Sequence, residues 1–428
     1  MKRINLKFLL VLVVALVVGA AGLFLLRRFQ VSRNAGNLAK LAKQRLEEDK
    51  PAEAIQLYQR YIGLRPDDHE AFAEFAKLML RRADAPDATR NDLARAYNTL
   101  ETAVRRSPEN DDLRRRLAEF QLRIGRAADA REHLDVLRER LESGDLKAPE
   151  EEEEGRDKLD ANLLTILSAR SLMGTADFEE SARLVANLIG FDIASKSFAN
   201  EGPATAAPTE AYLILGAILE EKLNDKAAAR MVLDRLVADQ SKDVQAWLAR
   251  SSWHRQHGDL DAAAADIAEA MRVEPENVNG IFAAFELALS RKDFDEAAKI
   301  AARGREVAPL DERAYRGLAA VALQRGDAAE AERVLLDGVD QLPGKASLLL
   351  MLADSQLQQN KIAEVSQTIT RIKEQYGSQS PAVGLLEGRL LVAQGKWADA
   401  KSRLELVRPL VLGSPDLVRQ VDLYLGQC

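Results

Sequence analysis

A regular spacing of residue types constrains the fold of this chain more than any other feature. Pro275, Pro309 and Pro343 are equally spaced, and three further columns keep the same step. These columns are Trp247, Ile281, Tyr315 and Leu349; Ala263, Ala297 and Ala331; and Ala270, Gly304 and Gly338. A period of about 34 residues with these residue types indicates pairs of antiparallel helices. We expect large side chains of each first helix to pack where Ala or Gly lets the second helix approach, and proline to end the second helix.

These columns resemble the tetratricopeptide repeat family. In that family Leu-Gly or Leu-Ala stands at the seventh and eighth positions of a unit, small residues at the twentieth and twenty-seventh, and proline at the thirty-second. The unit that fits best carries Leu318-Ala319, Ala331, Gly338 and Pro343. Arg250-Ser251 and Ala284-Phe285 depart from the pattern at the seventh and eighth positions. The resemblance implies an all-α fold, a right-handed superhelical solenoid of helical hairpins.

The rest of the chain divides into stretches of different regularity. We expect a tail and anchor at 1–33, repeat-like helices at 34–142, an acidic linker at 143–158, a degenerate helical hairpin at 159–190, a loop at 191–208 and the regular array at 209–428. The run Glu150 to Glu154 favours a solvated linker over a calcium loop, because it has no interspersed Asn or Gly. Pro415 to Cys428 is predicted to be a first helix without its second. Either it caps the array alone or, as we favour, the chain is a piece of a longer protein.

The amino terminus carries an apolar run. Phe8 to Leu26 contains nineteen residues without a charge. A helix of that length spans roughly 28 Å, which is close to the hydrocarbon thickness of a bilayer. Basic residues flank both ends, so the positive-inside rule is nearly balanced. Val18-Gly19-Ala20 also fits a signal-peptidase site, but the apolar run continues beyond it and Arg27-Arg28 follow, which favours an uncleaved transmembrane anchor.

Composition limits the classes of function. The chain has 428 residues, 47% of them hydrophobic and 30% charged, as in an ordered helical protein. The net charge of −7 and the lack of a basic face argue against nucleic acid as the main partner. Cys428 is the only cysteine, so an intrachain disulfide is impossible.

The few candidates for site chemistry have structural explanations. His254 and His257 are spaced so that both could face one ligand, but a zinc site needs further ligands, and His254 stands at a packing position. Arg325-Gly326-Asp327 resembles the adhesion tripeptide recognised by integrins. In phase with the repeats it is the turn between paired helices, where Asp327 can cap the second helix. We therefore expect no catalytic residues, no metal and no cofactor.

The family resemblance implies a concave peptide groove made by the first helix of each unit. The groove positions of the regular units include Gln245, Ser252, Asn279, Phe282, Glu286, Arg313 and Arg316. Arg313 and Arg316 could hold a carboxylate, or they are solvated surface arginines. The clamp for acidic carboxy-terminal peptides needs Lys at the fifth position and Asn at the ninth. The pairs here are Leu213/Ala217, Leu248/Ser252, Phe282/Glu286, Arg316/Ala320 and Leu350/Asp354. None of them matches, so a chaperone-tail adaptor is not supported.

The sequence thus predicts a non-enzymatic, membrane-anchored scaffold that binds a protein or peptide partner through the groove. An extracytoplasmic array is slightly favoured, and the oligomeric state stays open. Two alternatives remain. One is an envelope assembly or secretion and export factor, by analogy with other anchored repeat proteins. The other is the non-catalytic part of a longer enzyme.

Overall fold

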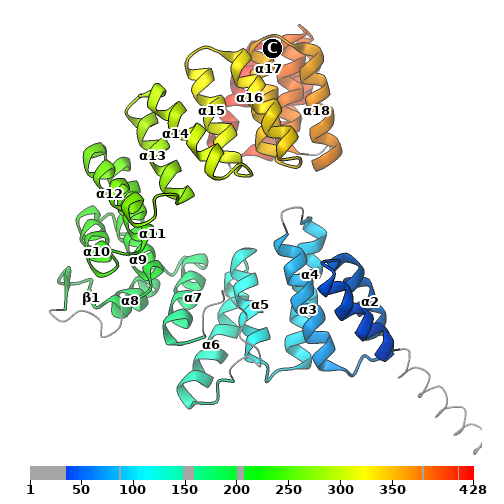
Figure 1. Cartoon of the computed structure of the whole chain (residues 1–428), viewed down its shortest axis with the longest axis vertical. Helices are drawn as coiled ribbons and strands as arrows, with labels where there is room; N and C mark the ends of the chain where they lie inside the picture. Colours follow the sequence, from blue (N-terminus) through cyan, green and yellow to red (C-terminus); the bar gives the residue numbers. More distant parts are fainter. Residues whose placement is uncertain (1–34, 86–87, 148–158, 200–206, 378–379, 413) are drawn as a thin grey trace, which may run out of the picture. The chain divides into compact units, whose positions relative to one another are not determined.

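The computed structural model describes residues 35–85, 88–147, 159–199, 207–377, 380–412 and 414–428. The described chain is built almost entirely of helices, and within each of its compact units consecutive helices pack against each other as antiparallel hairpins (Figure 1). It divides into two compact units, with the boundary between Asp225 and Lys226. The predicted all-α repeat architecture is confirmed at this level.

The first unit begins with a helix over residues 35–47. The helices that follow are α2 (Pro51–Leu64), α3 (His69–Asp84), α4 (Arg90–Arg106), α5 (Asp111–Arg123), α6 (Ala127–Ser143), α7 (Ala161–Gly174), α8 (Phe178–Ile189) and α9 (Thr209–Glu221). Between α8 and α9 lies an antiparallel hairpin of two short strands, β1 (Phe191–Asp192) and β2 (Ser197–Phe198). The start of the predicted loop is therefore a strand pair, in which Phe191 and Phe198 face each other with ring centroids 5.0 Å apart.

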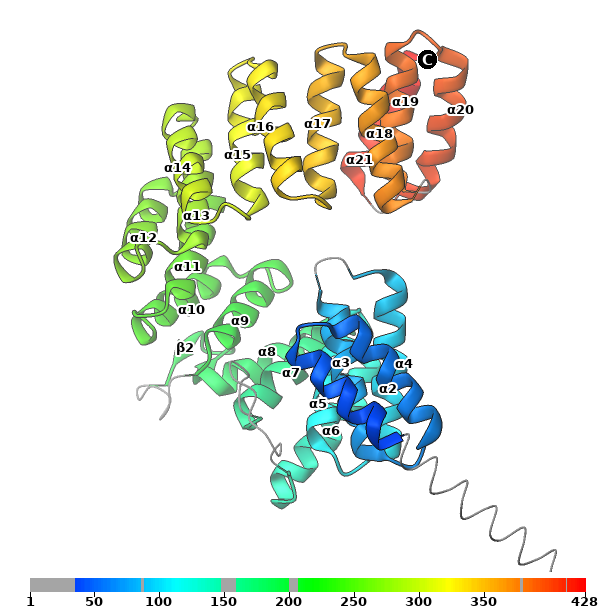
Figure 2. The ribbon, with the colours of Figure 1, turned by 45° about the vertical axis from the view of Figure 1, so that its right-hand side comes forward.

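The second unit is a regular succession of pairs, visible as neighbouring antiparallel helices from α15 onward (Figure 2). Its helices are α10 (Lys226–Asp239), α11 (Val244–Gln256), α12 (Leu260–Val273), α13 (Val278–Ser290), α14 (Phe294–Val307), α15 (Glu312–Gln324), α16 (Ala328–Gln341), α17 (Ala346–Gln358), α18 (Ile362–Tyr376), α19 (Pro381–Ala393), α20 (Trp397–Val407), the 3₁₀ turn η1 (Arg408–Val411) and α21 (Pro415–Gln427).

The repeat period also places the signals that begin the second helices. Asp259, Asp293 and Asp327 stand one period apart, and each carboxylate accepts a hydrogen bond from the backbone N–H three residues later. The residue before each of these caps has a left-handed conformation, and Gly258 and Gly326 adopt it without a Cβ penalty. The sequence predicts a cap at Asp327, and Asp259 and Asp293 cap their helices in the same way.

Packing within the hairpins follows the predicted columns. A Cβ added to Gly338 would lie 2.9 Å from Cγ of Tyr315, and one added to Gly304 would lie 3.6 Å from Cγ2 of Ile281. In these two hairpins, large residues of the first helix fill the space that glycine leaves open, and at Gly304 the Phe282 ring is closer still, at 3.0 Å. Pro309 follows the C-cap of α14, as the pattern predicted.

Arg250-Ser251 departs from the repeat pattern at the seventh and eighth positions, and polar contacts compensate for the missing apolar residue. Arg250 donates to both carboxylate oxygens of buried Asp266, from Nε at 3.0 Å and from Nη2 at 2.6 Å. The Ser251 hydroxyl donates to the Ala263 carbonyl at 3.1 Å. Because the side chains of Arg250 and Ser251 both gain partners, α11 and α12 pack against each other without the usual leucine at the seventh position.

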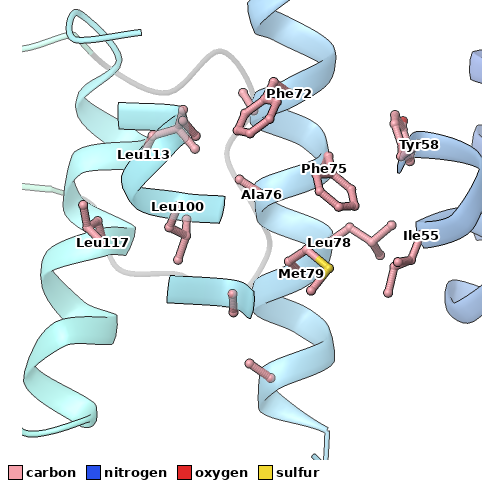
Figure 3. Packing of buried hydrophobic residues seen from close by; sticks show 14 of the residues in the cluster. Ile55, Tyr58, Phe72, Phe75, Ala76, Leu78, Met79, Leu100, Leu113 and Leu117 are labelled. Carbon is pink, nitrogen blue, oxygen red and sulfur yellow. The ribbon is translucent and has the colours of Figure 1, made fainter. Parts of the chain in front are cut away.

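The core of the first unit begins around α3 (Figure 3). Phe72, Phe75 and Met79 of this helix are buried between α2 on one side and α4 and α5 on the other. Leu100 and Leu117 of the latter helices are fully buried there. Apolar burial of this kind is the main stabilising term for each hairpin.

Two predicted segments lie outside the described residues: the anchor at 8–26 and the glutamate run at 150–154. Within the described part of the chain, no helix has both the length and the apolarity required to cross a bilayer.

Candidate functional site: the first-helix face of the second unit

The candidate site is the surface formed by the first helices of the second unit, which we call the first-helix face. It comprises α11, α13, α15, α17, α19 and α21. Neighbouring members of this series contact each other directly, or through the hydrogen bond from Arg313 of α15 to Asn279 of α13. The face is therefore continuous from α11 to α21.

Three of the seven predicted groove residues meet at one point on this face. Arg313 Nη1 donates to Oδ1 of Asn279 at 3.0 Å, and its guanidinium carbon lies 4.4 Å from the ring centroid of Phe282. The same guanidinium also donates to Asp311, from Nη2 to Oδ2 at 2.6 Å and from Nε to Oδ1 at 3.0 Å. These hydrogen bonds lower the pKa of Asp311 below its usual range. Arg313 is thus already engaged by a carboxylate of its own chain.

The other four predicted residues do not join this cluster. Arg316 lies 3.6 Å from Glu312 at the start of its own helix, so the two arginines hold separate acidic partners. Ser252 accepts a long hydrogen bond from Gln256 within α11, at 3.4 Å. Gln245 and Glu286 are exposed. The joint carboxylate site at Arg313 and Arg316 stays a prediction, and it would require both arginines to exchange partners.

A pocket of about 300 Å³ opens on the face near its carboxy-terminal end. Four consecutive first helices contribute to its wall: Leu323 of α15; Met351, Asp354 and Gln358 of α17; Arg389 of α19; and Gln420, Leu423 and Tyr424 of α21. Leu423 is 61% exposed, which is unusual for a side chain of its size. The pocket combines apolar walls with a few convergent polar groups, which is the usual composition of a binding site.

One ion pair organises this pocket. Arg389 Nη1 donates to Oδ1 of Asp354, and its guanidinium carbon lies 5.4 Å from the ring centroid of Tyr424. The arginine side chain is 15% exposed, whereas the aspartate is 41% exposed. The Arg389 Nε is buried without a hydrogen-bond partner among the described residues. The mouth of the pocket therefore presents Asp354, with Arg389 beneath it.

Sequence reasoning missed this pocket, although one signal was present. Asp354 and Arg389 occupy the ninth position of successive units, where opposite charges can meet across neighbouring helices. The part contributed by α21 keeps the same spacing, because Leu423 stands 34 residues after Arg389, beyond the 3₁₀ turn at Arg408–Val411.

The two histidines have the structural roles that their phase indicates. His254 is buried, with Nε2 at 3.9 Å from Oδ2 of Asp266. The His257 ring stacks on Trp253 with centroids 4.1 Å apart, and its Nδ1 lies 2.8 Å from the Trp253 carbonyl. Within the described residues no cluster of three or more His, Cys, Asp or Glu side chains could hold a metal ion. Arg325 of the tripeptide donates to the Phe294 carbonyl, which ties it to the preceding unit.

Comparisons with known proteins agree with this architecture. Two tetratricopeptide repeat family models match the chain, one over residues 89–145 and the other over 214–276 and 282–346. These matches identify tetratricopeptide repeats in both units of the chain. No curated protein sequence matches significantly. Repeats of this class bind protein or peptide partners and are typically non-catalytic, so the chain is a protein-interaction scaffold.

Several solved structures are similar to the chain. Yeast Tom70 is 14% identical with a TM-score of 0.44, and the match covers 92% of this chain and 96% of that one. A tetratricopeptide repeat protein from Parabacteroides merdae is 16% identical with a TM-score of 0.45, covering 62% and 98%. YrrB, described as a TPR protein with an unusual peptide-binding site, is 10% identical with a TM-score of 0.33, covering 44% and 97%.

Proposed function

We propose that the chain holds a segment of a partner protein against the first-helix face of the second unit. The observation that carries this proposal is the pocket at Met351, Arg389 and Leu423, to which four consecutive first helices contribute. A partner segment lying along the face would contact several units at once. Its affinity would come from shape and repeated contact, and the scaffold would supply no chemistry.

Apolar contact should contribute more to this binding than charge does. Arg389 and Arg313 already pair with Asp354 and Asp311. A partner carboxylate would have to displace these aspartates, and exposed ion pairs contribute little net free energy. Covering Leu423, in contrast, removes apolar surface from water at roughly 25 cal/mol per Å². We therefore expect the partner segment to place an apolar side chain beside Leu423.

Site-specific photo-crosslinking in the cells that make the protein would test this proposal. A photoreactive residue at Leu423 should give a discrete crosslinked species. Leu406 of α20 provides a matched control, because it is 65% exposed but does not line the pocket. Equal crosslinking at both positions, or none at Leu423, would count against the first-helix face. Met351→Glu should abolish the species at Leu423, since it puts a charge into the apolar wall.

We also propose that residues 8–26 anchor the scaffold in a membrane. The nineteen uncharged residues of this run support the proposal, since insertion of each Leu, Val or Phe is worth roughly −0.3 to −0.6 kcal/mol. The full chain should stay with membranes after alkaline carbonate extraction, whereas Val13→Arg/Leu16→Arg should release it. Protease protection in sealed vesicles would then decide between a cytoplasmic scaffold and an envelope assembly or export factor.

A further inference from the structure

The strand hairpin of the first unit and α8 form an open pocket of about 820 Å³. Buried Ala182 and Ala186 of α8 form one side, and Phe191 and Phe198 of the hairpin form another. Leu223, which follows α9, also lines the cavity and is 39% exposed. The interior is therefore apolar, and its volume lies within the range of ligand pockets.

The hairpin that forms this cavity is held in place by specific interactions. The Asp192 carboxylate accepts hydrogen bonds from the backbone N–H of Ala194 at 2.8 Å and of Ser195 at 3.3 Å. Beyond the strands, the Ala199 N–H donates to the Gly190 carbonyl at 2.9 Å. Lys196 at the tip pairs with Asp225 at 2.5 Å. A cavity fixed in this way is preorganised, which lowers the entropic cost of binding.

The charges at the rim of the cavity are mainly negative. Glu179 and Asp192 are its acidic lining residues, and both are exposed. The backbone N–H groups of Ala194 and Ser195 lower the pKa of Asp192, so this carboxylate stays ionised well into the acidic range. Arg183 is the basic residue among the described lining residues, and Glu180 neutralises it at 2.9 Å. A cation placed at the rim would therefore lie beside the exposed carboxylates of Glu179 and Asp192.

We propose that this hairpin pocket is a docking site for an apolar side chain that is followed by a lysine or arginine in a partner protein. The apolar side chain would fill the space between Ala186 and the two phenylalanines, and the basic residue would lie beside Glu179. A protein segment fits better than a free small molecule, because the charged lining groups stand at the rim, where a chain would continue outward. The hairpin pocket belongs to the first unit, so this docking does not depend on the first-helix face.

A defined peptide provides the probe. Acetyl-Ser-Phe-Lys-Ser-amide would be titrated against the full-length chain in lipid nanodiscs, with binding followed by saturation-transfer NMR and empty nanodiscs as the blank. Saturable binding is expected. The peptide with Ser in place of Phe should lose its signal, and the peptide with Glu in place of Lys should bind about fivefold more weakly. Failure of the first peptide to bind saturably would overturn the proposal.

Two variants, each with a matched control, would show whether the peptide binds in the hairpin pocket. Glu179→Lys should weaken the peptide about fivefold, whereas Glu132→Lys on exposed α6 should not change its affinity. Leu223→Ser should also weaken it about fivefold, whereas Leu310→Ser, at a 70% exposed position of the second unit, should not. All four positions are partly or fully exposed, so folding should persist, which circular dichroism would verify. Equal affinities in all four variants would exclude the hairpin pocket.

Discussion

The two units of this chain build the same kind of hairpin in different ways. In the second unit the first helices begin at Val244, Val278, Glu312 and Ala346, at one constant interval. In the first unit they begin at His69, Asp111, Ala161 and Thr209, at intervals that are longer and unequal. The extra residues lie in a long turn between α3 and α4, in the stretch after α6 and around the strand hairpin.

In the second unit, a constant period lets one contact recur. After α13, α15 and α17, the residue that follows the first helix reaches back 31 residues to a backbone carbonyl at the start of the preceding second helix. Arg291 donates to the Leu260 carbonyl, Arg325 to that of Phe294 and Gln359 to that of Ala328, each at 3.0 Å. Three successive repeat interfaces therefore share this polar contact in addition to their apolar packing.

In the first unit, irregular spacing is accompanied by polar contacts that occur once. The buried Asp111 carboxylate accepts a hydrogen bond from Arg140 at 2.5 Å and from the Lys147 backbone N–H at 2.9 Å, which fixes the chain after α6. The buried Ser171 hydroxyl donates to the Ala127 carbonyl at 2.8 Å, which joins α7 to α6. Because these junctions have no recurring contact, a single buried polar group stabilises each of them. No equivalent contact replaces such a group when it is removed.

Among the variants that test this comparison, removal of the Asp111 carboxylate should lower the unfolding free energy most. Asp111→Ala leaves Arg140 and a backbone N–H without their acceptor, so the first unit should lose about 3 kcal/mol of unfolding free energy. Asp129→Ala is the control, because its pair with Arg126 is exposed and should matter by less than about 0.5 kcal/mol. Urea unfolding with hydrogen exchange to separate the units would measure both. Equal losses would mean that the buried carboxylate has no special role.

Filling a small-residue position should have the next largest effect. Gly338→Ala places a Cβ 2.9 Å from the Tyr315 ring, so the second unit should be destabilised by about 1–2 kcal/mol. Gly426→Ala meets no atom within 4 Å and should stabilise α21 by up to about 1 kcal/mol through helix propensity. Thermal unfolding of both variants would give shifts of opposite sign. A stabilised Gly338→Ala would show that close approach at this column is dispensable.

Removal of one recurring contact should have a smaller effect. Arg325→Ala eliminates the hydrogen bonds to the Phe294 carbonyl and Asp295, which should cost about 1 kcal/mol. Arg272→Ala removes only an exposed pair with Glu269 and should be nearly neutral. Hydrogen exchange at the amides of α14 and α15 would report the difference. Unchanged exchange in Arg325→Ala would remove this contact from the account of the interface.

The smallest expected effect is on the pH dependence of the stability of the first unit. The Tyr61 hydroxyl and the Ala71 N–H donate to Asp68 and lower its pKa below the usual range. A depressed carboxylate stabilises the fold above its unfolded pKa of about 4, and this contribution is lost as pH falls through the folded value. Tyr61→Phe should move the pKa of Asp68 back upward. In a carboxyl-carbon NMR titration of this variant, the pKa of Asp311 in the second unit should stay lowered by Arg313. A change in the pKa of both Asp68 and Asp311 would show that the two units do not titrate independently.

The sequence by itself determined the helical hairpins and their phase. Tyr315 and Gly338 contact each other because every repeat places these two positions in the same geometry. The spacing alone therefore predicts the contact. The same argument correctly placed Asp327 at a helix start. Only the tertiary structure showed the contacts that form where the period fails, which are the strand hairpin at Phe191 and the buried partners of Asp111. These contacts join residues whose separation follows no repeat, so only the packed chain brings them together.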